Sequence, residues 1–97
     1  MKEVIEQLQS YNTLDRNILK VVEETTELNE VLIKFLTKKP DLKPPVEKII
    51  EEMGDVIFRM KVVANHFGIN EAVNARIKQK AEQVGNWMKE SKHKGGV

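Results

Sequence analysis

Hydrophobic residues recur at helical spacing along most of this chain. A short amphipathic segment from Lys2 to about Ser10 precedes "YNT", where Asn12 or Thr13 is placed to cap a following helix. From there to about Thr37 the apolar positions recur at three, four or seven residues: Leu14, Ile18, Val21, Leu28, Leu32 and Phe35. This rhythm, broken only by Thr25, predicts a second helix with one packed stripe.

A proline-rich break then interrupts the helical pattern. "KKPDLKPP" has three prolines in six residues, which cannot continue a helix but help to start a new one. We expect a third helix from about Val46 to Phe67 and Gly68 as its terminator. Asn70 is then expected to cap a fourth helix, which gives way to the polar end "SKHKGGV".

No segment alternates polar and apolar residues as a half-buried strand does. We therefore predict an all-α fold, in which the second and third helices form an antiparallel hairpin across the proline loop. Residues 1–97 are expected to form one domain, a four-helix bundle, with residues 90–97 as a frayed tail. Because a domain of 97 residues buries only a modest core, we expect partner subunits to complete it.

Composition narrows the class of protein. The chain has no cysteine, which excludes disulfides and thiolate metal sites. No apolar run nears the roughly 20 residues of a membrane span, and "MKEVIEQLQS" lacks the apolar centre of a signal peptide, so we expect a cytoplasmic location. The C-terminal basic residues form a short stretch without interleaved aromatics, which argues against nucleic-acid binding.

The net charge of +1 conceals an acidic middle, with nine acidic and five basic residues from Glu23 to Asp55. "EETTELNE" and "EEMGD" concentrate this charge on the second and third predicted helices. Neighbours on a helix face are three or four residues apart, so Glu24 pairs with Glu27, and Glu52 with Asp55. Both pairs lie at the margin of an apolar stripe and would meet when the hairpin closes.

Four carboxylates gathered near a buried seam repel one another unless a cation joins them. Mg²⁺ is the natural candidate, with Mn²⁺ as the alternative ion, because hard cations prefer oxygen ligands. Single glutamates on a helix are usually solvated, but two matched pairs on consecutive helices favour a site. Gly54 inside the third helix indicates that a backbone or a ligand approaches closely there.

These motifs resemble the all-α nucleoside triphosphate pyrophosphohydrolases of the MazG-like family. The resemblance covers about Leu14 to Phe67 and rests on E-x-x-E at Glu24 and Glu27 and E-x-x-D at Glu52 and Asp55, each preceded by another acid. It implies Mg²⁺ on these four carboxylates, and a bundle assembled as a homodimer or homotetramer. The implied reaction cleaves a nucleoside triphosphate between its α and β phosphates, giving the monophosphate and pyrophosphate.

Further roles follow from the same resemblance. Glu23 or Glu24 would orient or deprotonate the attacking water, and the sequence does not choose between them. Arg76 and Lys80, four residues apart on the fourth helix, are expected to bind phosphate, although an exposed basic face is the alternative.

We expect Trp87 to fill a core or subunit interface rather than stack on a base, and His66 to be an exposed residue at a helix end.

Two other functions stay open at this stage. The first is phosphoribosyl-ATP pyrophosphatase, which would share the fold and the metal chemistry. The segment "EEMGDVIF" is nevertheless more similar to the MazG-like enzymes than to that pyrophosphatase. A non-catalytic helical interaction module would use its apolar stripe for a partner and leave its carboxylates solvated.

Overall fold

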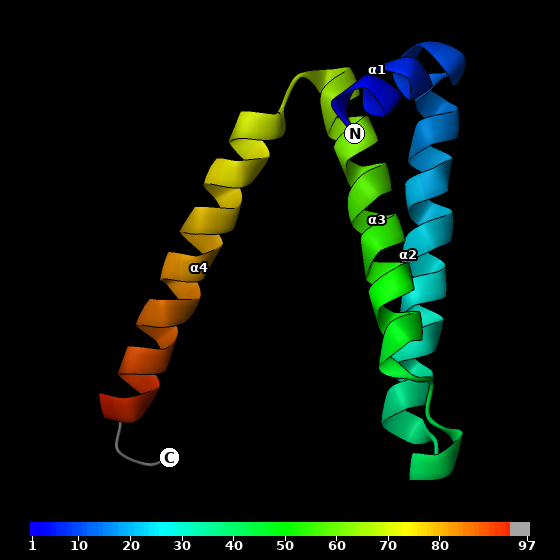
Figure 1. Cartoon of the computed structure of the whole chain (residues 1–97). Helices are drawn as coiled ribbons and strands as arrows, with labels where there is room; N and C mark the ends of the chain where they lie inside the picture. The colour runs from blue at the N-terminus through cyan, green and yellow to red at the C-terminus, as the bar shows by residue number, and fades with distance from the viewer. Residues whose placement is uncertain (94–97) are drawn as a thin grey trace.

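The computed structural model describes residues 1–93 of the chain, and nearly all of them are helical (Figure 1). The order is α1 (Lys2–Tyr11), α2 (Leu14–Thr37), a 3-10 turn η1 (Pro40–Leu42), α3 (Val46–Phe67) and α4 (Asn70–His93). Residues 1–93 include no strand, so the all-α prediction is confirmed. None of the helices in this range is both long enough and apolar enough to cross a membrane.

The ends of the helices follow local chemistry. The Thr13 side chain accepts a hydrogen bond from the Arg16 backbone N–H at 3.2 Å, which satisfies one of the free donors at the start of α2. Gly68 ends α3 with φ 64°, a left-handed conformation that glycine adopts without steric cost. The predicted cap at Asn70 is wrong: Asn70 is the first residue of α4, and the Ile69 carbonyl already accepts from the Val73 N–H at 2.9 Å.

Helices α2 and α3 form the predicted antiparallel hairpin around the proline turn, and α1 folds back over its far end (Figure 1). The few fully covered apolar side chains lie in these three helices: Ile5, Val31, Val56, Val62 and Ala64. Thr25, which breaks the apolar stripe of α2, is accommodated because its hydroxyl donates to the Val21 carbonyl at 2.8 Å.

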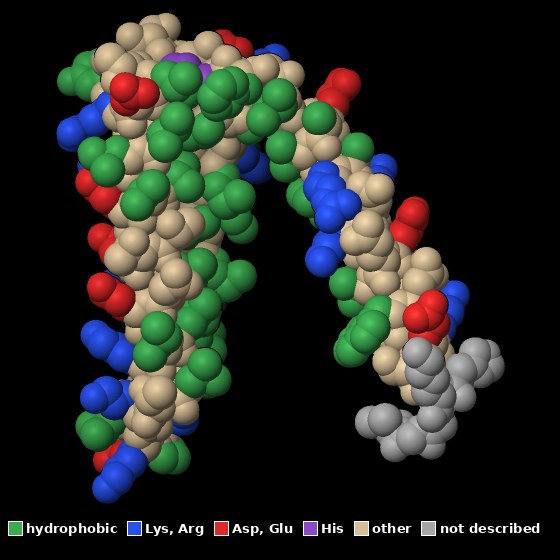
Figure 2. All heavy atoms as spheres, turned by 180° about the vertical axis from the view of Figure 1, so that it is seen from behind, with side chains coloured by type: hydrophobic (Ala, Val, Ile, Leu, Met, Phe, Trp, Pro, Cys, Tyr) green, Lys and Arg blue, Asp and Glu red, His purple; other side chains and the backbone are tan. Residues whose placement is uncertain are grey.

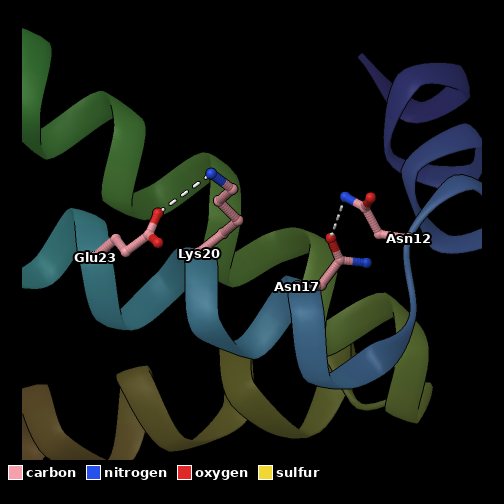
Figure 3. Close-up of polar contacts among 4 residues, drawn as sticks. All are labelled: Asn12, Asn17, Lys20 and Glu23. Carbon is pink, nitrogen blue, oxygen red and sulfur yellow. Dashed lines mark hydrogen bonds and ion pairs between the residues drawn. The ribbon is translucent and has the colours of Figure 1, made fainter.

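A polar network fixes α1 to the hairpin. Asn17 is only 1% exposed, and its Nδ2 donates to the Leu8 carbonyl at 3.2 Å and lies 2.8 Å from His66 Nε2. The Asn12 amide donates to Asn17 Oδ1 at 3.1 Å (Figure 3). Since an amide nitrogen only donates, His66 Nε2 is the acceptor, which places the ring proton of the neutral imidazole on Nδ1. The expectation that His66 is exposed is therefore wrong, because this contact half-buries it.

Helix α4 diverges from the hairpin instead of packing along it, so that the chain forms an open V (Figure 1). Trp87 on α4 is 64% exposed, so it fills no core within one chain. Completion of a four-helix bundle by oligomerisation stays a prediction. Helix α4 extends to His93, into the expected tail, whose last residues, 94–97, lie outside the described part of the chain.

Candidate metal centre

The hairpin brings together acidic side chains from its two helices. Glu24 on α2 and Glu52 and Asp55 on α3 each present one carboxylate oxygen, and these three oxygens all lie within 4.8 Å of one another. We call these three residues, together with Glu27, the acidic cluster. Glu52 is buried, Glu24 is half-buried and Asp55 is exposed. The group therefore extends from the interface between α2 and α3 to the solvent.

Two oxygens of this group are buried without a hydrogen-bond partner, Oε2 of Glu24 and Oε2 of Glu52. A buried carboxylate oxygen without a partner is costly, and two from facing helices add mutual repulsion. A divalent cation would compensate both, since hard cations take carboxylate oxygens as ligands. The residues present therefore fit a divalent metal.

Glu27 belongs to the same electrostatic environment. The negative charge of Glu24 raises the pKa of the Glu27 carboxyl above its ordinary value of 4.5, and desolvation and the charge of Glu52 raise it further. Glu27 is exposed, whereas Glu24 is half-buried and Glu52 is buried.

Lys48 is a residue of this site that sequence reasoning missed. Its Nζ lies 3.1 Å from Glu52 Oε1 and 2.9 Å from Glu51 Oε2, and these carboxylates raise the pKa of the Lys48 ammonium. The signal was present in the sequence, because Lys48 is four residues before Glu52 and so shares its helix face. Lys48 therefore compensates part of the negative charge that the buried Glu52 brings to the site.

Glu23, one of the two candidates for activating water, lies apart from the cluster. Its carboxylate is exposed and accepts from Lys20 Nζ at 3.2 Å, one turn earlier on α2 (Figure 3). The other candidate, Glu24, is the one whose carboxylate faces α3.

Arg76 and Lys80 share a shallow apolar patch of α4 with Val73 and Ile77. Arg76 Nη1 donates to Gln79 Oε1 at 2.8 Å. Among the side chains of residues 1–91 no ion pair joins α4 to the acidic cluster, since α4 diverges from the hairpin. One chain therefore brings together three of the four predicted metal ligands, Glu24, Glu52 and Asp55, but not the predicted phosphate-binding residues.

Comparison with known proteins agrees with this geometry. The family model described as the MazG nucleotide pyrophosphohydrolase domain matches residues 12–88, which is most of the chain and includes the whole acidic cluster. No curated protein and no solved structure matches. The chain belongs to the MazG nucleotide pyrophosphohydrolase family. The family is divalent-metal dependent, which is consistent with the acidic cluster as a metal site.

Proposed function

We propose that this protein is a Mg²⁺-dependent nucleotide pyrophosphohydrolase. It cleaves a nucleoside triphosphate between the α and β phosphates and releases the monophosphate and pyrophosphate. The observation that carries the proposal is the meeting of three carboxylate oxygens within 4.8 Å across α2 and α3, two of the side chains having a buried oxygen with no partner. Family membership supplies the class of reaction.

In this proposal Glu24, Glu27, Glu52 and Asp55 hold the ion, with Mn²⁺ as the alternative to Mg²⁺. When bound, the ion supplies positive charge against the phosphates and lowers the pKa of water at the site. A bound triphosphate would add oxygen ligands to those of the four carboxylates, as is usual for magnesium sites with few carboxylates.

Of the two candidates for activating water, we assign Glu24. One of its carboxylate oxygens lies within 4.8 Å of oxygens of Glu52 and Asp55, whereas the Glu23 carboxylate pairs with Lys20. The water oxygen attacks phosphorus in line, its proton passes to the Glu24 carboxylate, and the anhydride bond between the α and β phosphates breaks with pyrophosphate as leaving group. Arg76 and Lys80 are proposed to hold the phosphates, in a homodimer or homotetramer that acts in the cytoplasm on free nucleotides rather than on nucleic acid.

The test is pyrophosphate release from a panel of canonical and modified nucleoside triphosphates with Mg²⁺, together with phosphoribosyl-ATP. Glu52→Gln should lose activity by about a hundredfold or more, because the amide removes a ligand charge from the buried position. Glu51→Gln is the matched control: it is the next residue on α3, it is exposed, and it should retain activity. Full activity of Glu52→Gln, or no turnover of any nucleotide by the wild type, would refute the proposal.

A further inference from the structure

A lysine precedes each half of the acidic cluster. The segments "KVVEETTE" and "KIIEEMGD" have the same order of residue types: a lysine, two apolar residues, two glutamates, two further residues and another acid. Lys20 therefore has the same place before Glu24 as Lys48 has before Glu52. Side chains four residues apart on a helix are neighbours, so each lysine is within reach of the first predicted metal ligand of its own helix.

The two lysines differ in what they contact. Lys20 Nζ pairs with the exposed Glu23, and the ion pairs of the described side chains include none between Lys20 and Glu24. Lys48 Nζ, in contrast, lies 3.1 Å from Glu52 Oε1. Of the two lysines, only Lys48 therefore contacts a predicted metal ligand.

Burial distinguishes this contact from the other ion pairs. Charged side chains line the outer edge of the hairpin, on the side away from α4 (Figure 2), and exposed pairs contribute little because water solvates both partners. The Glu52 side chain is only 5% exposed, against 47% for Glu23. Because water compensates so little of the Glu52 charge, removal of Lys48 would leave an unpaired charge in a buried position, which is strongly destabilising.

A divalent ion at the acidic cluster would compensate the same charge. One carboxylate oxygen of Glu52 lies within 4.8 Å of oxygens of Glu24 and Asp55, and Glu52 Oε2 is buried without a hydrogen-bond partner. An ion that binds Glu52 shares this carboxylate with the Lys48 ammonium. Two cations on one carboxylate repel each other, most strongly where water is largely excluded. The lysine and the ion are therefore alternative partners for Glu52.

We propose that Lys48 is the counter-ion of Glu52 in the metal-free protein and competes with the divalent ion for this carboxylate. The lysine stabilises the fold when no ion is bound, and it lowers the affinity of the site for the ion. This inference rests on the metal site of the proposed function, and its test measures metal affinity and unfolding rather than turnover.

The experiment is calorimetric titration of the full chain with Mg²⁺ in the absence of nucleotide, together with thermal unfolding in chelator and at saturating Mg²⁺. Lys48→Met retains an unbranched apolar side chain and removes the charge. It should melt at a lower temperature than the wild type in chelator, and it should bind Mg²⁺ at least about tenfold more tightly. Saturating Mg²⁺ should remove most of the difference in melting temperature, because the bound ion replaces the lysine.

Three further variants isolate the charge and its partner. Lys20→Met is the matched control, since Lys20 has the same position in its motif but pairs with an exposed glutamate, and it should change Mg²⁺ affinity by less than about threefold. Lys48→Arg retains the charge and should bind Mg²⁺ within about threefold of the wild type. In a Glu52→Gln background, Lys48→Met should no longer lower the melting temperature in chelator, because no buried charge is left unpaired.

The outcomes separate this inference from the proposed function. A wild type that binds Mg²⁺ while Lys48→Met binds it equally or more weakly would overturn the inference and leave the metal site intact. Equal melting temperatures of Lys48→Met and the wild type in chelator would also overturn it, as would an equal gain of affinity in Lys20→Met. Loss of helicity of Lys48→Met in chelator that Mg²⁺ restores, measured by circular dichroism, would support it. A wild type that binds no Mg²⁺ would overturn the metal site itself, and this inference with it.

Discussion

Lys48 Nζ lies 3.1 Å from Glu52 Oε1, while the other oxygen of the same buried carboxylate, Oε2, has no hydrogen-bond partner. The lysine therefore compensates part of the Glu52 charge, and Glu52 also offers one carboxylate oxygen that lies within 4.8 Å of oxygens of Glu24 and Asp55. Because Lys48 pairs with Glu52, the hairpin can close without a bound ion. Glu52 keeps one oxygen without a partner, which remains available as a metal ligand. The carboxylates are thus close together before an ion binds. Their repulsion lowers the stability of the metal-free fold, and a bound divalent ion would remove that loss.

The pH dependence of stability follows from Glu27. The charge of Glu24, with burial and Glu52, raises the Glu27 pKa in the folded protein above 4.5, so the folded state holds that proton more tightly than the unfolded chain does. Metal-free protein should therefore gain stability as pH falls through the folded-state pKa and lose it as pH rises. Lys48, whose pKa is also raised, contributes stability below its ordinary value of 10.5 and adds no slope in this range.

Thermal melting from pH 4.5 to 8, with and without Mg²⁺, measures this effect. Glu27→Gln should melt higher than the wild type at neutral pH without metal, and saturating Mg²⁺ should remove or reverse that difference. A wild type that is less stable than Glu27→Gln at every pH and every Mg²⁺ concentration would contradict the placement of Glu27 beside the metal.

The assignment of the water-activating carboxylate separates two adjacent residues. Glu24→Gln should reduce kcat by about a hundredfold or more, while Glu23→Gln should change it by less than about threefold, because of the two only Glu24 has a carboxylate oxygen close to those of Glu52 and Asp55. Steady-state kinetics with the best nucleotide of the panel measures both. If Glu23→Gln is the inactive variant and Glu24→Gln only weakens metal binding, the two roles must be exchanged.

Arg76 and Lys80 should act on the substrate and not on the ion. Arg76→Ala and Lys80→Ala are each expected to raise KM for the nucleotide about tenfold, because a phosphate contact is lost, and to leave Mg²⁺ affinity without nucleotide unchanged. Lys78→Ala, on the other side of α4, serves as the control, with unaltered kinetics. Wild-type KM in both variants would favour the alternative interpretation of an exposed basic face.

Asn17 should be essential for the packing of α1. Asn17→Ala removes its bonds to Leu8 and Asn12 and its contact with His66, and leaves polar groups without partners, so we expect a loss of about 1–3 kcal/mol. Asn29→Ala is the matched control, since Asn29 is an exposed asparagine of the same helix. Urea unfolding of both variants measures the difference. Equal midpoints would show that the network contributes nothing to stability.

The sequence predicted most of the fold because each helix has a local signal. The bounds of α2 coincide with those expected, since Thr13 caps one end and the proline break follows the other. The cap prediction at Asn70 is wrong because the first hydrogen bond of α4 is accepted by the backbone carbonyl of Ile69. The helix therefore begins one residue earlier than a cap at Asn70 would allow. The divergence of α4 could not be predicted, because an apolar stripe indicates that a helix packs but not against which element.

For the site, spacing along two helices predicted which carboxylates meet, and the hairpin brings Glu24, Glu52 and Asp55 together. The network of Asn17, Asn12 and His66 was missed, because these residues lie far apart in the sequence or between elements and share no periodic pattern. Arg76 and Lys80 depend on how chains assemble, and the sequence of one chain does not encode that geometry directly.

The most direct test of the acidic cluster is calorimetric titration of the metal-free protein with Mg²⁺ and Mn²⁺ in the absence of nucleotide. We predict saturable binding with a fixed stoichiometry, at least about tenfold weaker in Glu52→Gln and within about twofold of the wild type in Glu51→Gln. Heats no greater than those of dilution for the wild type, or equal affinities for Glu52→Gln and Glu51→Gln, would contradict a divalent ion between α2 and α3.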